Sequence, residues 1–128
     1  MSDPNVDVIH EINDAIASSD LGSVAGHLHT DVVWEHNIGA GSPEEGVYRG
    51  REDVVRLLER IVEPWEYLRA EPRSIDEAGE GRYHVVGDLV AKHRTSNAEI
   101  AASYEQQLEL RDGLLMKGSM KTGLAQSL

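Results

Sequence analysis

Apolar residues recur at helical spacing near the start of the chain. Ile9, Ile12 and Ile16 fall on one face of a helix because three and four residues separate them. The Asp3-Pro4 pair is typical of an N-cap followed by proline at the first helical position. The pattern predicts a helix that begins there and ends near residues 18–19.

A second, shorter helix is predicted after Asp20, which can accept hydrogen bonds as its N-cap. Its apolar positions are Leu21, Val24 and Leu28, and the glycines between them lower its helix propensity.

The clearest helical pattern begins at Arg51, where Val54 and Leu58 share one face. Pro64 ends this third helix, because proline cannot donate the helical hydrogen bond. Residues 38–47 precede the helix and contain three glycines and a proline, so this stretch is predicted to be a loop.

Much of the remaining chain is rich in β-prone residues, with turn signals between the stretches. Pro72 within one stretch predicts an edge strand or a β-bulge, because proline cannot donate to a central ladder. Residues 77–81 are predicted to be a turn, and Asp112-Gly113 is a strong hairpin signal. The predicted strands cover residues 32–37, 66–76, 83–95, 98–111 and 114–121.

This order of elements, helices first and hairpins afterwards, is typical of α+β proteins. The 128 residues suit one compact domain, and no internal repeat or linker interrupts them. We therefore expect residues 1–128 to form a single α+β domain.

The composition narrows the classes of partner. The 12 basic and 23 acidic residues give a net charge of −11, which disfavours nucleic acid and anionic membrane surfaces. Without cysteine, disulfides, zinc–thiolate sites and thiol nucleophiles are excluded. We find no secretory signal and no apolar run long enough to span a bilayer, so a cytoplasmic location is expected.

Several motifs occur in an order and spacing that one known group of proteins shares. D-L at 20–21 opens the second helix, and L-x-x-D-V-x-W-E at 28–35 leads into the first strand. Y-R-G-R-E-x-V at 48–54 opens the third helix, and L-R-D-G at 110–113 enters a hairpin. With these motifs the chain resembles the SnoaL-like and ketosteroid-isomerase-like families of the nuclear-transport-factor-2-like superfamily.

The resemblance implies a fold and a pocket. The fold would be a cone in which three helices of the N-terminal half pack into a curved, mostly antiparallel sheet. The pocket inside the cone would take a small, mostly apolar molecule without a cofactor, and the outer sheet face would form a homodimer. Because one fold carries many functions, the resemblance does not name a reaction.

Ketosteroid isomerases combine a carboxylate base with two acidic hydrogen-bond donors. Aligned with that family, the base position falls at His36, and the two donor positions fall near Ile12 and Gln106. None of the three family residues is present at these positions. The departure leaves open a different enzyme, a ligand-binding module without catalysis, or a dimerisation domain with a filled cone.

His36 is the first candidate base. Side chains alternate along a strand, so Trp34 and His36 share one face while Glu35 takes the other. A neutral imidazole can remove a proton next to a carbonyl and return it elsewhere. The alternative is that His36 lies half exposed at the strand end and has no catalytic role.

Tyr104, Gln106 and Leu108 alternate on a later strand and therefore face the same way. If that face lines the pocket, the Gln106 amide and the Tyr104 phenol can donate to an enolate oxygen. A satisfied structural role is the alternative for Gln106. Either face of residues 83–90 could line the pocket; Asp88 is an alternative base if its face does, and a surface carboxylate otherwise.

The resemblance also places Tyr48, Trp65 and Tyr67 at the mouth of the pocket. Aromatic side chains there can stack on a flat ligand or fill the core.

No metal or phosphate site is predicted. His27, His29 and Asp31 straddle a helix end, where a two-residue spacing does not bring side chains to one face. Residues 39–46 are glycine-rich but lack the lysine of a phosphate-binding loop. An epoxide hydrolase needs paired carboxylates around an arginine, and only Asp88 leaves that activity open.

The sequence thus predicts a cofactor-free isomerase or cyclase acting on an apolar, carbonyl-containing substrate of polyketide or steroid type. His36 would move the proton, and Gln106 with Tyr104 would stabilise the enolate oxygen. The alternative is a non-catalytic ligand-binding or dimerisation module of the same fold.

Overall fold

The computed structural model describes residues 3–38 and 42–128. These residues form three helices, α1 (Pro4–Ala17), α2 (Leu21–Gly26) and α3 (Arg51–Val62). They also form the strands β1 (Leu28–Asn37), β2 (Gly46–Arg49), β3 (Trp65–Gly79), β4 (Arg82–His93), β5 (Glu99–Arg111), β6 (Leu114–Thr122) and β7 (Gln126–Ser127).

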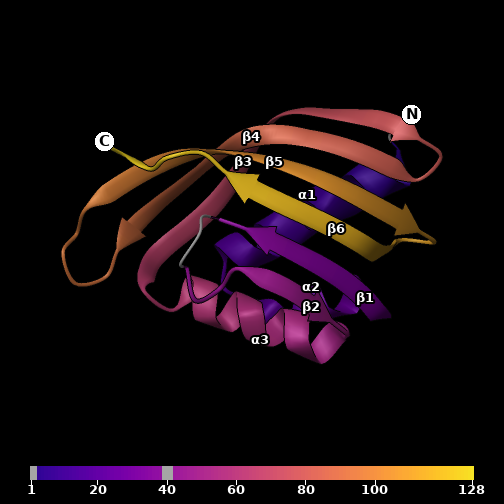
Figure 1. Ribbon diagram of the computed structural model, residues 1–128, viewed down its shortest axis with the longest axis horizontal. Coiled ribbons are helices and arrows are strands. Elements are labelled where there is room, and N and C mark those ends of the chain that lie inside the picture. Colours follow the sequence, from indigo (N-terminus) through magenta and orange to yellow (C-terminus); the bar gives the residue numbers. More distant parts are fainter. Residues whose placement is uncertain (1–2, 39–41) are drawn as a thin grey trace.

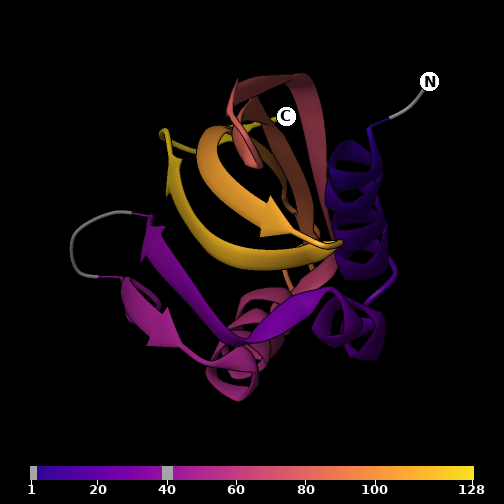
Figure 2. The same cartoon turned by 90° about the vertical axis from the view of Figure 1, so that its right-hand side faces the viewer.

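The strands make one seven-stranded sheet in the order β2-β1-β6-β5-β4-β3, with β7 paired to β5. Neighbouring strands are antiparallel except β1 and β6, which are parallel. The sheet curves strongly and does not close, with α1 along one side and α3 beneath it (Figures 1 and 2). The prediction of an α+β cone with a curved, mostly antiparallel sheet is confirmed.

The helices begin where the sequence predicts. The Asp3 carboxylate accepts a hydrogen bond from the Asn5 backbone N–H at 2.9 Å, so α1 is capped and Pro4 needs no donor. Asp20 caps α2 in the same way, accepting from Ser23 N at 3.3 Å. α2 is shorter than its apolar pattern, because Leu28 starts β1 instead of completing the helix.

Two turn-related predictions are confirmed. Pro72 lies in β3, which ends the sheet order, and the pairing with β4 shifts register between Pro72 and Ser74. Asp112 and Gly113 have φ values of 53° and 76°, as a tight hairpin between β5 and β6 requires.

Some strand limits differ from the prediction. β1 begins at Leu28 and not at residue 32, and β3 runs to Gly79 through most of the predicted turn 77–81. The predicted loop 38–47 includes the start of β2, while its residues 39–41 lie outside the described residues. β2 has four residues and is an edge strand, so its pairing with β1 leaves little trace in the local sequence.

The core fills the space between the helices and the inner face of the sheet. Its most deeply buried side chains are those of Val24, Leu28, Val32, Leu57, Val85 and Tyr104. No helix in residues 3–38 and 42–128 has the length and apolar character needed to cross a membrane.

Candidate functional site

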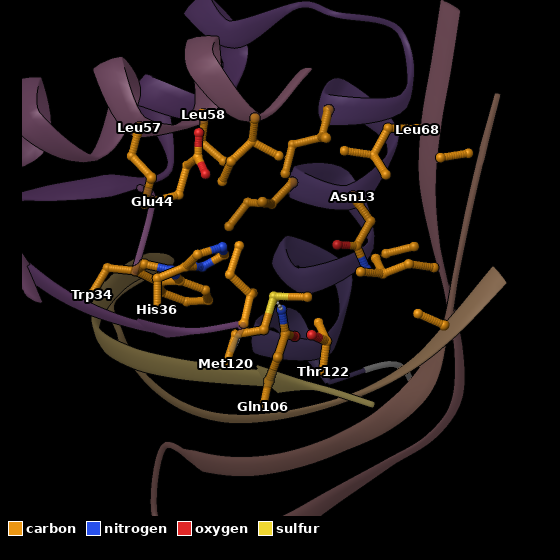
Figure 3. Close-up of a pocket in the computed structure, with 18 of the residues that line it drawn as sticks. Asn13, Trp34, His36, Glu44, Leu57, Leu58, Leu68, Gln106, Met120 and Thr122 are labelled. Carbon is orange, nitrogen blue, oxygen red and sulfur yellow. Dashed lines mark hydrogen bonds between the residues drawn. The ribbon is translucent and has the colours of Figure 1, made fainter. Parts of the chain in front are cut away.

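A cavity of about 550 Å³ lies between the helices and the inner face of the sheet (Figure 3). This volume is within the range of small-molecule sites. Most of the wall is apolar. The helices contribute Ile9, Ile12, Ile16, Val54, Leu57 and Leu58, and the sheet contributes Leu68, Leu89, Ala91, Leu108, Leu110 and Leu115.

β1 presents two ring side chains to this cavity. Trp34 and His36 both line it, as the alternation of the strand predicts, while Glu35 is exposed. Only 4% of the His36 surface is exposed, so the alternative of a half-exposed imidazole is wrong. Trp34 Nε1 donates a hydrogen bond to His36 Nδ1 at 3.1 Å.

The environment keeps the His36 imidazole neutral. Burial lowers the pKa of His36 below its usual 6.5, and the negative charge of Glu44 opposes that shift without reversing it. At neutral pH the ring therefore has one proton, and burial favours this uncharged form.

Gln106 and Leu108 line the sheet wall of the cavity. Gln106 Nε2 donates to Met120 Sδ at 3.8 Å. A thioether sulfur is a weak acceptor, so a ligand oxygen would be a better partner for this amide. The amide of Gln106 and the imidazole of His36 both point into the cavity, from β5 and β1 (Figure 3).

Glu44 is a lining residue that the sequence analysis did not single out. It precedes β2 and lies across the cavity from Gln106 (Figure 3). Its carboxylate accepts a hydrogen bond from Ser42 Oγ at 3.1 Å, and its backbone carbonyl accepts from the Tyr48 hydroxyl at 2.7 Å. The Arg60 guanidinium, which also lines the cavity, lies 5.8 Å from the centre of the Tyr48 ring.

Asn13 on α1 is a second lining residue that sequence reasoning missed. It directly follows Ile12 and lies four residues after Ile9, so the helical pattern contained the signal. Its side-chain Nδ2 is buried and has no hydrogen-bond partner among the described residues.

The predicted aromatic rim is only partly present. Trp65 lines the cavity and packs edge-on against His93, with ring centres 5.5 Å apart. Tyr67 does not line it; its hydroxyl bonds to Glu99 Oε1 at 3.4 Å. Tyr48 does not line it either; its hydroxyl donates to the Glu44 backbone carbonyl.

Tyr104 is on the inner face but not in the cavity, so its expected role as an oxyanion donor is corrected. Its ring lies over Gly87, where an added Cβ would come 2.9 Å from Tyr104 Cε1. The hydroxyl is buried without a partner among the described residues, and burial raises the pKa of Tyr104 to about 12.

The expectation that Asp88 could act as the base is also corrected. The inner face of β4 carries Tyr83, Val85, Leu89 and Ala91, and Asp88 points to the opposite face. There Asp88 Oδ2 pairs with Arg73 Nε at 3.5 Å. It is a surface carboxylate, because the face of β4 that buries Tyr83 and Val85 is the one that meets the cavity.

The histidines near the start of β1 make local contacts. His27 Nε2 lies 3.3 Å from Glu11 Oε2, and His29 Nδ1 accepts a hydrogen bond from Asp31 N at 3.0 Å. Within residues 3–38 and 42–128, no three His, Asp or Glu side chains come together in a way that could hold a metal ion.

Fold and cavity together define an α+β cone that encloses a mostly apolar site with a few polar groups. The model of the SnoaL-like domain family matches residues 9–117. This chain belongs to the SnoaL-like domain family.

Solved structures of similar fold cover almost the whole chain. An NTF2-like protein of unknown function from Burkholderia pseudomallei has a TM-score of 0.80 and 19% identity, with 93% of this chain and 90% of that chain covered. TerC, co-crystallised with polyporic acid, has a TM-score of 0.78 and 21% identity, with coverage of 95% and 92%. IdmH from Streptomyces antibioticus, a proposed polyketide cyclase, has a TM-score of 0.79 and 16% identity, with coverage of 92% and 91%.

At these identities the structural similarity shows the fold alone. A comparison of the sequence with curated proteins finds no significant match.

Proposed function

We propose that this protein binds one small, mostly apolar, carbonyl-containing molecule in its cavity and catalyses a cofactor-free isomerisation or cyclisation. The observation that carries the proposal is that a buried neutral His36 and the Gln106 amide line the same cavity of about 550 Å³. The substrate would be of polyketide or steroid type, because the wall is apolar and only a few polar groups interrupt it.

The chemistry would be proton transfer next to a carbonyl group. Removing such a proton leaves negative charge on the carbonyl oxygen, and hydrogen-bond donors in a dry site stabilise that charge. The Gln106 amide is such a donor, and the His36 imidazole can donate a hydrogen bond or carry a proton. Glu44 adds a carboxylate to the same cavity. The fold shared with the proposed polyketide cyclase IdmH supports this class of reaction.

A ligand-binding protein without catalysis is the second candidate, and one observation favours it. The two positions where ketosteroid isomerases have acidic donors fall near Ile12 and Gln106 here. Ile12 adds only apolar surface to the cavity wall, and the Gln106 amide bonds to Met120. Such a cavity could hold a ligand without activating it.

We further propose a homodimer formed through the outer face of the sheet, and a cytoplasmic location. The outer face carries side chains such as Glu105, Gln107 and Lys121, so this interface would be polar. Analytical ultracentrifugation of the whole chain tests the dimer, and a monomer at micromolar concentration would refute it.

The test of function is deuterium exchange in D₂O with apolar bicyclic ketones, 2-tetralone among them. Catalysed loss of the proton signal next to the carbonyl, above the buffer rate, is the expected result. Gln106→Leu should slow it about 10²-fold, as removal of an oxyanion donor does. Gln107→Leu is the matched control, because Gln107 is next to Gln106 in the chain but is exposed on the outer face of the sheet. This variant should catalyse the exchange at the wild-type rate.

Calorimetric titration of the same ketones separates the two candidates. A ketone that binds with a measurable heat but exchanges only at the buffer rate would favour the binding protein and contradict the enzyme.

A further inference from the structure

The hydrogen bond between Trp34 and His36 determines which ring nitrogen holds the proton. An indole Nε1–H can only donate, so His36 Nδ1, 3.1 Å away, must accept through its lone pair. A neutral imidazole has one N–H, which is then on Nε2. Burial keeps the ring neutral, as its lowered pKa indicates.

The position of the Trp34 ring is itself fixed by packing. The ring lies on the backbone of Gly118, where an added Cβ would be 2.5 Å from Trp34 Cζ3 and 2.7 Å from Cε3. Gly118 pairs with Trp34 across the parallel β1–β6 ladder. The ring therefore has a defined place on the sheet, and so does its N–H.

A His36 in this tautomer offers a donor to the cavity and not a base. The lone pair of His36 Nδ1 accepts the hydrogen bond from Trp34, and His36 Nε2 holds the proton. The imidazole points into the cavity (Figure 3), so Nε2–H can donate to a ligand oxygen.

The carboxylate that lines the same cavity is Glu44. Its charge is close enough to act on the pKa of His36. Two contacts position it: its backbone carbonyl is held by the Tyr48 hydroxyl at 2.7 Å, and its carboxylate by Ser42 Oγ at 3.1 Å. In Figure 3 its carboxylate is directed toward the cavity, on the side opposite Gln106.

We infer that Trp34 is a positioning residue that holds His36 as the Nε2–H tautomer, so that His36 donates to the ligand's carbonyl oxygen while Glu44 is the base. This inference rests on the proposed function and divides its roles differently from the sequence prediction, which gave proton removal to His36.

The step balances without a cofactor. A Glu44 carboxylate oxygen takes the proton from the carbon next to the carbonyl, and the C–H electron pair forms the enolate C=C bond. The C=O π pair moves to oxygen, which accepts hydrogen bonds from His36 Nε2–H and the Gln106 amide. In an isomerisation, protonated Glu44 returns its proton to the far carbon of a conjugated dienolate. In a cyclisation, the enolate carbon attacks a second carbonyl, whose π pair moves to its oxygen, and protonated Glu44 gives its proton to that oxygen.

Nitrogen-15 NMR of histidine-labelled protein tests the tautomer without any substrate. The expected result is the Nε2–H pattern for His36 at neutral pH, with its signals assigned by their absence in His36→Gln. Trp34→Phe should convert this to a mixture of tautomers, because the donor is lost while an aromatic ring remains. Trp65→Phe is the matched control and should leave His36 unchanged, since Trp65 packs on His93. An Nδ1–H pattern in the wild type would overturn the inference.

The division of roles is tested by ketone exchange in three variants. Glu44→Gln should lower the exchange rate about 10²-fold or more while ketone binding persists, since a general base is lost. His36→Gln retains an amide donor and should stay within about tenfold of the wild type, whereas His36→Leu should lose about 10²-fold.

An active Glu44→Gln together with equally inactive His36→Gln and His36→Leu would make His36 the base and overturn the assignment. Failure of the wild type to exchange any bound ketone would refute the proposed function and the role of Glu44 together. The NMR result stands apart from both, because it reports on the tautomer alone.

Discussion

Replacing Gly118 by alanine is the sharpest test of how the site is built. The new Cβ would lie 2.5 Å from Trp34 Cζ3 and 3.1 Å from Leu108 Cδ2. Non-bonded carbon atoms essentially never approach to 2.5 Å, so the Trp34 ring must leave its place on the sheet. Because the same ring donates to His36 at 3.1 Å, the substitution breaks that hydrogen bond as well.

The size of the effect follows from three contributions. Overpacking a well-filled site costs about 1–3 kcal/mol. Leaving a buried polar atom such as His36 Nδ1 without its donor costs about 1–3 kcal/mol. Alanine recovers about 0.5–1 kcal/mol, because glycine loses more backbone entropy on folding. Together these contributions should lower the free energy of unfolding by about 1–5.5 kcal/mol, which lowers Tm by about 4–22 °C in a domain of this size.

Thermal unfolding followed by circular dichroism measures this change. The control is Gly26→Ala at the end of α2, where no heavy atom lies within 4 Å of the added Cβ. That variant should be as stable as the wild type or slightly more stable, since alanine is the better helix former. If Gly118→Ala unfolds at the same temperature as Gly26→Ala, the Trp34 ring does not lie on Gly118, and the positioning argument fails.

Three further predictions follow from burial and close packing. Leu57→Ala, at a side chain with 0% exposure, should lower the free energy of unfolding by about 2–5 kcal/mol in urea titration, and a loss below 1 kcal/mol would contradict its core position. Gly87→Ala should lower the free energy of unfolding more than Gly118→Ala does in the same titration. Its Cβ would meet the Glu71 carbonyl oxygen and, at 2.8 Å, Pro72 Cα, and these backbone atoms cannot rotate away. The folded-state pKa of His36 is lowered from 6.5, so the unfolded chain binds its proton more readily, and stability should fall as pH drops below 6.5 toward the folded pKa. Calorimetric Tm values between pH 7.5 and 5 should fall less steeply in His36→Gln, and equal slopes would refute the shift.

The helices and hairpins were accessible from the sequence because their signals are local. Capping by Asp3, the apolar face of α3, and the Asp112-Gly113 turn each depend on residues a few positions apart. β2 was missed for the opposite reason, because it exists through its pairing with β1. The parallel pairing of β1 with β6 joins segments about eighty residues apart, and no local pattern specifies it.

Alternation along strands predicted which side chains share a face but did not show where the cavity ends. Tyr104 shares the inner face with Gln106, yet the missing side chain of Gly87 lets the Tyr104 ring pack against that strand, outside the cavity. The Trp34–His36 hydrogen bond was equally hidden. Alternation puts two residues on one face but does not say that their rings touch.

Glu44 shows most clearly what the sequence could not supply. It stands beside Glu45 in a stretch without periodicity, and the contacts that distinguish Glu44, from the Tyr48 hydroxyl and from Ser42 Oγ, are visible only in the structure. Among the described lining residues Glu44 is the one carboxylate, while the positions near which ketosteroid isomerases have acidic groups hold His36, Ile12 and Gln106. If the protein catalyses proton transfer, the carboxylate that does so is in the segment before β2, and not on the sheet or on α1. Neutral hydrogen-bond donors, His36 on β1 and Gln106 on β5, then stand where ketosteroid isomerases have acidic groups. The exchange rates of the Glu44 and His36 variants decide whether that relocation preserves catalysis or marks its loss.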